Sequence, residues 1–128
     1  FGRGRSMAAF TKEATVARPN FIELPARDLA ASKAFFETVF GMTMTAFGPT
    51  YACTLTGDVD IGLQADQEEA TKAPLLVIEV KDLEASLAAV IATGATVIKP
   101  IFSFPGGRRF HFRDPGGNEL AAMQVDPR

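Results

Sequence analysis

A repeated segment is the feature that most constrains the fold of this chain. Residues 27–32, with the sequence Arg-Asp-Leu-Ala-Ala-Ser, return 54 positions later as residues 81–86, with the sequence Lys-Asp-Leu-Glu-Ala-Ser. An apolar run that is typical of a β-strand precedes each copy. A repeated strand-to-helix corner predicts two similar modules within one chain.

The composition indicates one globular domain with internal pseudo-symmetry. The chain has 128 residues, of which 47% are hydrophobic and 22% charged, so it can build one core but not two independent ones. Its formal net charge is −2, without a long block of either sign, which argues against a nucleic-acid partner. No apolar stretch approaches the roughly 20 residues that span a bilayer, which argues against a membrane role. Cys53 is the sole cysteine and cannot form an internal disulfide, which fits a cytoplasmic protein.

We interpret residues 1–18 as an added leader, ahead of Met7, followed by a mobile N-terminal arm. The domain is then expected over residues 19–126, with modules of about 19–65 and 74–126. Residues 65–73, which are mostly polar, would join the two modules.

The first module is predicted to begin with a strand over 21–24 and a helix that Asp28 caps and Gly41 ends. Three further strands are expected near 43–47, 50–56 and 59–64, with turns at the Gly48-Pro49 and Gly57-Asp58 pairs. The predicted buried stripe of the helix is Leu29, Ser32, Phe35 or Phe36, Val39 and Phe40.

The second module repeats this plan. A strand over 75–80 leads to a helix that Asp82 caps and Gly94 ends, and its predicted stripe is Leu83, Leu87, Val90 and Ile91. A strand over 96–99 is expected to break at Pro100, and a loop around 103–107 should follow. Two more strands, 109–113 and 119–125, flank a turn at 114–117. Each half is therefore β-α-β-β-β. Helices on one face of each sheet leave the other face free to enclose a concave cleft.

Three segments, 24–36, 39–41 and 112–118, together with the repeat, make the chain resemble a known family. This family is the glyoxalase, bleomycin-resistance and extradiol-dioxygenase superfamily, also called the vicinal oxygen chelate proteins, and the resemblance covers about residues 20–124. It implies an α+β fold in which two tandem βαβββ modules form an open, incomplete barrel.

The resemblance also implies where a metal would bind. Members that act as lyases, isomerases, epimerases or dioxygenases usually hold a divalent cation with four ligands drawn from His, Gln and Glu. The matching positions in this chain are Phe21, Gly62, Leu75 and Ala121. None of these side chains offers a lone pair to a cation, so we expect neither the usual metal site nor another cofactor.

Strand alternation predicts the other residues of the cleft face. Phe110 and Phe112 should cover the helix side of their strand, which turns His111 and its neighbours toward the cleft. Apolar walls with a few polar groups are typical of a pocket for a small organic molecule. The expected lining includes Phe21, Glu23, Asp60, Gln64, Val77, Glu79, Arg109, His111, Arg113, Glu119 and Met123.

Several of these residues have more than one possible role. His111 could be a hydrogen-bonded structural residue, a ligand contact, or an acid-base or metal-binding group. Glu23 could form an ion pair with Arg109, Arg113 or His111, or bind a ligand directly. Cys53 fits inert packing better than nucleophilic chemistry. Rings that either line the pocket or pack in the core are Phe47, Phe102 and Phe104.

The leading hypothesis is a homodimeric protein that binds a small organic molecule without the usual metal. Its predicted ligand-binding residues are Phe21, Glu23, Gln64, Arg109, His111 and Met123. One alternative is a metal-dependent lyase, isomerase or dioxygenase that uses displaced ligands such as Glu23, His111 and Glu79. If the chain is an enzyme, the resemblance implies a lactoylglutathione-lyase-like or dioxygenase-like activity. The other alternative is a non-catalytic subunit.

Overall fold

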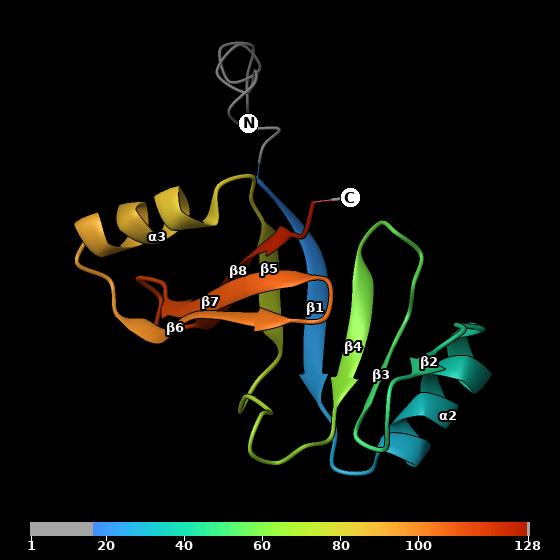
Figure 1. The fold of residues 1–128 in the computed structure, drawn as a ribbon. Coiled ribbons are helices and arrows are strands. Elements are labelled where there is room, and N and C mark those ends of the chain that lie inside the picture. The colour runs from blue at the N-terminus through green and yellow to red at the C-terminus, as the bar shows by residue number, and fades with distance from the viewer. Residues whose placement is uncertain (1–16, 128) are drawn as a thin grey trace, which may run out of the picture. The chain divides into compact units, whose positions relative to one another are not determined.

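A computed structural model describes residues 17–127, so all but the last two residues of the expected leader and arm lie outside the described part. The fold belongs to the α+β class, and the predicted β-α-β-β-β order occurs twice (Figure 1). The first set is β1 (Arg18–Pro25), α2 (Leu29–Phe40), β2 (Thr45–Ala46), β3 (Tyr51–Cys53) and β4 (Asp60–Gln64). The second set is β5 (Leu75–Glu79), α3 (Leu83–Ala92), β6 (Val97–Phe104), β7 (Gly107–Arg113) and β8 (Glu119–Val125).

The chain divides into two compact units. The first unit is Asn20–Val77, and the second is 78–127 together with 17–19. The proposed module boundaries, about 19–65 and 74–126, stay a prediction.

In the first unit the strands are ordered β2-β3-β4-β1. Strands β1 and β4 run parallel, as Figure 1 shows, and Glu23 pairs with Gly62 in their register. Strand β3 pairs antiparallel with β4 on its other side. The core beneath α2 is built on Ala26, Met44 and Leu63. The opposite face of the sheet carries polar residues, among them Glu23 and Gln64.

Helix α2 begins and ends where the sequence predicts. Asp28 accepts a hydrogen bond from the Ala31 N–H at 3.1 Å, and Gly41 ends the helix with a φ of +67°, a conformation that costs glycine little. The predicted buried stripe is wrong in part, because Phe35, Val39 and Phe40 are each more than half exposed. The helix packs instead through Leu29 and Phe36, which lie two turns apart on one side.

The strands near 43–47 and 50–56 are shorter than predicted. Strand β3 ends early because the carboxylate of Asp60 forms hydrogen bonds with the loop that follows this strand. Asp60 accepts hydrogen bonds from the hydroxyls of Thr54 and Thr56 at 2.7 and 2.8 Å, and from the N–H groups of Thr56 and Gly57 at 2.8 and 3.1 Å. The carboxylate thus satisfies polar groups of 54–57 that would otherwise pair along a strand.

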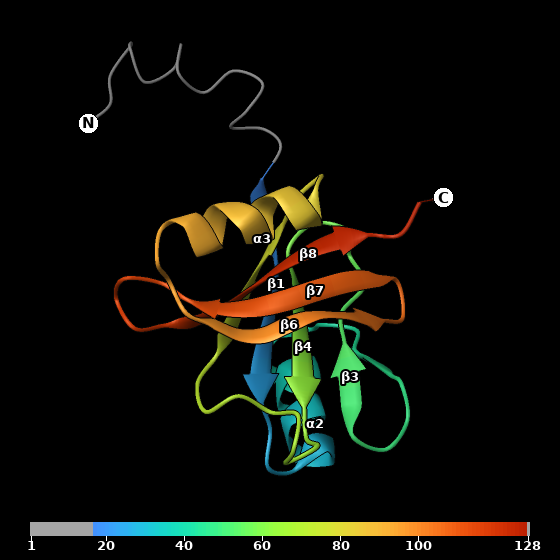
Figure 2. The same ribbon diagram turned by 60° about the vertical axis from the view of Figure 1, so that its left-hand side comes forward.

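In the second unit β7 pairs antiparallel with β6 and β8, and α3 lies against β7 and β8 (Figure 2). Asp82 caps α3 by accepting from the Ala85 N–H at 3.0 Å, as predicted. The core of this unit is built on Leu83, Phe110 and Ala122. Ile91 is 57% exposed and does not belong to the buried stripe, since it turns about 100° away from Val90 around the helix.

Pro100 does not end a strand, contrary to prediction. Strand β6 continues through it, and the expected loop shrinks to the turn at 105–106. The pairing of β6 with β7 shifts register between Lys99 and Phe102, and β6 is the outer strand of its sheet. An outer strand with an irregularity at this point tolerates a residue that has no N–H to donate.

The two outer strands also bear on the expected homodimer. Strand β2 has two residues, and β6 carries Pro100 and two register shifts, features that discourage pairing with a second chain. Association through sheet edges is therefore not favoured, and dimerisation stays a prediction. Within residues 17–127, no helix is long and apolar enough to cross a membrane.

Candidate functional site

Three of the predicted ligand-binding residues share one face of the first unit. Phe21 and Glu23 alternate along β1, and Gln64 lies on the matching face of β4 because Glu23 pairs with Gly62. Glu23 is 3% exposed and accepts a hydrogen bond from the Tyr51 hydroxyl at 3.2 Å. The amide oxygen of Gln64 accepts from the Asp66 N–H at 2.9 Å, so this oxygen stabilises the turn after β4.

Gly62 lies at the centre of this face with no space above it. A Cβ added at Gly62 would lie 2.5 Å from Cζ and 2.6 Å from Cε2 of Phe21, and closer still to the Tyr51 hydroxyl. Non-bonded carbon atoms pack at about 3.5–4.0 Å. The Phe21 ring and the Tyr51 hydroxyl therefore occupy the volume that a longer side chain at position 62 would need.

The other three predicted residues share one face of the second unit. Arg109 pairs with Met123 and His111 pairs with Ala121 across β7 and β8, which places these side chains on the same side of the sheet. Phe110 packs on α3 from the opposite side, as predicted. The adjacent pair Arg108-Arg109 is consequently split between faces, and Arg108 forms a two-bond ion pair with Glu84 of α3.

His111 is the most constrained polar residue on this face. It is fully buried, and its Nδ1 lies 2.8 Å from Oε2 of Glu119. An ionised carboxylate can only accept, so Nδ1 carries the proton of this hydrogen bond. The other ring nitrogen, Nε2, is buried and has no hydrogen-bond partner among the residues that the structure describes.

The charge state of His111 follows from its surroundings. Burial is the largest influence and lowers the pKa of the imidazole, and the cations of Arg109 and Lys99 lower this pKa further. Glu119 acts in the opposite direction, but the net shift of the pKa is downward. His111 is therefore neutral at pH 7, and Nε2 presents a lone pair.

Aromatic rings and cations surround His111. The rings of Phe102 and His111 have centroids 5.6 Å apart. The Arg109 guanidinium lies 5.4 Å from the ring centre of Phe102 and 5.6 Å from that of Phe104, and the Lys99 ammonium lies 5.8 Å from that of Phe102. These distances fit cation-π interactions.

The residues do not fit the metal that the fold family implies. Of the four matching positions, Leu75 and Ala121 are fully buried and apolar, and Gly62 is closed off by Phe21. Within 17–127, no group of three or more His, Cys, Asp or Glu side chains could hold a metal ion. The displaced ligands of the alternative hypothesis form no such group within 17–127 either, and each of them contacts another side chain. Glu23 contacts Tyr51, His111 contacts Glu119, and Glu79 forms an ion pair with Arg18 at 3.5 Å.

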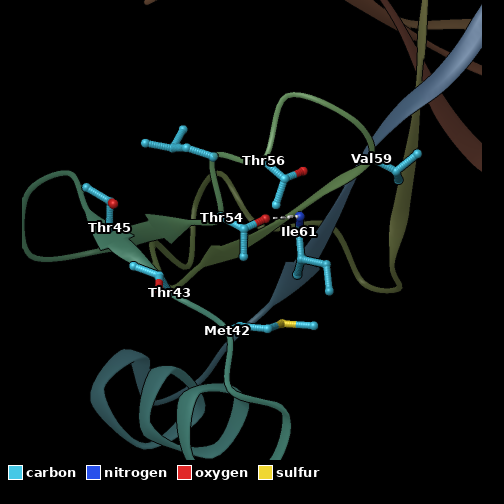
Figure 3. A pocket seen from close by; sticks show the side chains of 8 residues that line it. Met42, Thr43, Thr45, Thr54, Thr56, Val59 and Ile61 are labelled. Atoms are coloured by element: carbon cyan, nitrogen blue, oxygen red, sulfur yellow. Dashed lines mark hydrogen bonds between the residues drawn. The ribbon is translucent and has the colours of Figure 1, made fainter.

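A pocket of about 300 Å³ lies in the first unit (Figure 3). Ile61 contributes to it, and side chains at 61 and 62 point to opposite faces of β4. In Figure 3, Thr54 accepts a hydrogen bond from the Ile61 N–H, at 3.0 Å. The lining is Met42, Thr43, Thr45, Thr54, Leu55, Thr56, Val59 and Ile61. A second pocket, of about 650 Å³, lies at the end of α3 near Phe112 and Pro115. None of the predicted ligand-binding residues lines either pocket.

Sequence reasoning missed some neighbours of the site residues. Tyr51, which contacts Glu23, gave no signal, because the expected strand over 50–56 was not assigned a face. The pairing of His111 with Glu119 could have been found, since the turn at 114–117 sets the register of β7 and β8 and makes these residues diagonal neighbours. Cys53 is buried, and burial raises the pKa of its thiol, in line with the packing role preferred for it.

Solved structures confirm the fold. The chain aligns with NAD-dependent benzaldehyde dehydrogenase from Legionella pneumophila at 18% identity and a TM-score of 0.68, covering 84% of this chain and 100% of that one. Methylmalonyl-CoA epimerase from Mycobacterium tuberculosis aligns at 14% identity and a TM-score of 0.68, covering 85% and 88%. The Mn(II)-bound glyoxalase from Novosphingobium aromaticivorans aligns at 19% identity and a TM-score of 0.64, covering 84% of this chain and 40% of that one.

These identities are low, so the three likenesses establish the fold alone. No curated protein sequence matches this chain. A family model, however, matches residues 18–122, which include both helices and nearly all of the strands. The chain belongs to the Glyoxalase/Bleomycin resistance protein/Dioxygenase superfamily.

Proposed function

We propose that this protein binds a small, partly aromatic organic molecule on its strand faces without a divalent metal. One observation carries the proposal: the positions where the family usually has metal ligands hold Phe21, Gly62, Leu75 and Ala121, while groups that can orient a ligand stand beside them. Glu23 is next to Phe21 on its face, and His111 pairs with Ala121. A face of this kind supplies apolar contact and directed hydrogen bonds, but not a cation.

The proposed binding residues are the six predicted ones, with reduced weight on Gln64. Its amide oxygen already serves the turn at Asp66, which leaves the amide N–H groups for a ligand. Arg109 and His111 have the strongest support, because the rings of Phe102 and Phe104 hold the Arg109 guanidinium and Glu119 holds the imidazole of His111. Held side chains lose little entropy when a ligand binds.

A thermal-shift experiment tests the proposal. The protein is heated with EDTA, with Zn²⁺, Mn²⁺ or Ni²⁺, and with a set of small aromatic compounds. We expect no change of Tm with chelator or metal and a rise of several degrees with some aromatic compounds, since a ligand at 100 times its Kd adds about 2.7 kcal/mol of stability. A Tm that falls with EDTA and returns with one metal would overturn the metal-free part of the proposal. Indifference to every aromatic compound would favour a non-catalytic subunit.

A further inference from the structure

The Nε2 atom of His111 is the strongest unexplained feature of the described residues. A buried polar atom without a hydrogen bond destabilises the folded state, and native proteins keep few of them. Nε2 is such an atom, on a side chain that is 1% exposed. The opposite nitrogen is held by Glu119, so rotation of the ring would exchange one unsatisfied atom for another.

The partner that Nε2 lacks has a definite chemistry. Because Nδ1 carries the ring proton and donates it in a hydrogen bond to Glu119, Nε2 of the neutral ring is an acceptor, and its missing partner is a donor. The cations of Arg109 and Lys99 lie on the same face, and both contact the Phe102 ring that packs against His111. These two positive charges outnumber the single negative charge of Glu119 beside His111, which disfavours a donor that is itself cationic, such as an ammonium group, and favours one that gains negative charge as it shares its proton.

We propose that His111 Nε2, oriented by Glu119, is the acceptor for a weakly acidic hydroxyl group of the ligand, and that Lys99 and Arg109 exclude amines from this position. This inference rests on the proposed function, since it names the chemical class of that ligand. The ligand is then an uncharged or anionic molecule with an O–H group on or beside a planar ring system. Glu119 acts as a positioning residue, because it reaches the ligand only through the imidazole.

Access to Nε2 requires a neighbouring side chain to move, since the atom is buried. We assign this movement to the Phe102 side chain. It stands on the outer strand β6, directly after the register shift that follows Lys99, and its ring packs against His111. Strand irregularities of this kind re-aim side chains and weaken local pairing.

Three probes of similar size test the inference: 4-nitrophenol, its methyl ether 4-nitroanisole, and 4-nitrobenzylamine. Dissociation constants are measured at pH 7 by equilibrium dialysis with the full chain. We expect 4-nitrophenol to bind about tenfold more tightly than the ether, the ratio that one hydrogen bond to a buried acceptor supplies. The amine should bind more weakly than the ether. The visible absorbance of bound 4-nitrophenol should be that of the neutral phenol, because the phenolate has no proton to donate to Nε2.

His111→Phe keeps an aromatic ring beside Phe102 but removes both nitrogens. In this variant the preference for the phenol over the ether should disappear, while the affinity for the ether stays within about twofold, because the ether never used Nε2. Glu119→Gln should keep only part of the preference, since a neutral amide accepts the Nδ1 hydrogen bond less strongly than a carboxylate and holds the imidazole less firmly. Lys81→Gln, at an exposed position before α3, is the matched control and should change nothing.

The outcomes separate this inference from the proposed function. If wild-type protein binds the phenol and the ether equally, the protein binds aromatic molecules without a hydrogen bond from the ligand to Nε2. The inference is then wrong. If the amine binds as tightly as the phenol, the assigned role of Lys99 and Arg109 is wrong. If no probe binds, the proposed function fails, and the inference fails with it. The wild-type comparisons decide between these outcomes even if His111→Phe does not fold.

Discussion

Replacing Gly62 with alanine tests the reasoning that no metal ligand fits at this position. Gly62 has no positive φ, so alanine can adopt its backbone conformation, and a Gly→Ala change at a compatible strand position ordinarily stabilises a protein by about 0.4–1 kcal/mol. The added Cβ would lie 2.5–2.6 Å from the Phe21 ring, about 1 Å inside normal contact. Overpacking of this size costs about 1–3 kcal/mol. We therefore expect G62A to destabilise the protein, against the sign that backbone entropy alone would give.

The magnitude is measured by urea unfolding of wild type, G62A, F21L and the double variant. F21L removes the distal ring atoms that meet the new Cβ. In the F21L background the cost of G62A should fall by at least about 1 kcal/mol, a coupling expected only for side chains in contact. In wild type the change should lower Tm by about 4 °C per kcal/mol for a chain of this size. A stabilising G62A would mean that the space above Gly62 is open, and the case against a ligand at this position would fail. A cost of G62A that is unchanged by F21L would assign the clash to the Tyr51 hydroxyl and not to the Phe21 ring.

The remaining predictions concern stability and its pH dependence. Asp60→Asn should cost about 1–3 kcal/mol in urea unfolding, since an amide nitrogen cannot accept the Gly57 N–H. Burial of Asp60 raises the pKa of its carboxyl, but the hydrogen bonds to it outweigh burial, so the pKa is lowered in the folded state. The stability that Asp60 contributes is therefore complete above its unfolded pKa of about 4 and is lost as the pH falls toward the lower folded pKa. D60N should flatten that part of the profile of unfolding free energy against pH. The lowered pKa of His111 makes the free energy of unfolding fall as the pH drops below about 6.5. In thermal melts, His111→Phe should remove the dependence of Tm on pH in this range. An unchanged dependence would assign the titration to another group. Asp28→Ala and Asp82→Ala should each cost about 1 kcal/mol by loss of a helix cap, with Lys81→Ala as the control near the second cap.

Local features of the sequence predicted the elements well. The caps at Asp28 and Asp82 and the stops at Gly41 and Gly94 are decided by residues within one helical turn, so they could be identified without tertiary information. Strand β8 was predicted with its observed bounds because the turn at 114–117 precedes a plain alternating run. The assignment of Phe110 to the helix side and His111 to the opposite side followed from the same alternation.

Features that depend on neighbours in space were predicted less well. The exposed side of α2 was wrong because Phe35, Phe36 and Phe40 are equally apolar, and only the position of the helix on its sheet decides which of them is covered. The continuation of β6 through Pro100 depends on its place as an outer strand, which no local pattern reveals. Tyr51 meets Glu23 because β3 and β1 lie on either side of β4.

By itself, the sequence determined the doubled β-α-β-β-β plan, the family, and the identity of the four residues that the resemblance matches to metal ligands, because these follow from residue identity and spacing along the chain. Only the tertiary structure decided that Phe21 and Tyr51 close the space over Gly62. It also decided that one nitrogen of His111 bonds to Glu119, while the other has no hydrogen-bond partner within residues 17–127. Those outcomes depend on which side chains meet across strands. Contacts of that kind are set by register and packing, which residue identity alone does not encode.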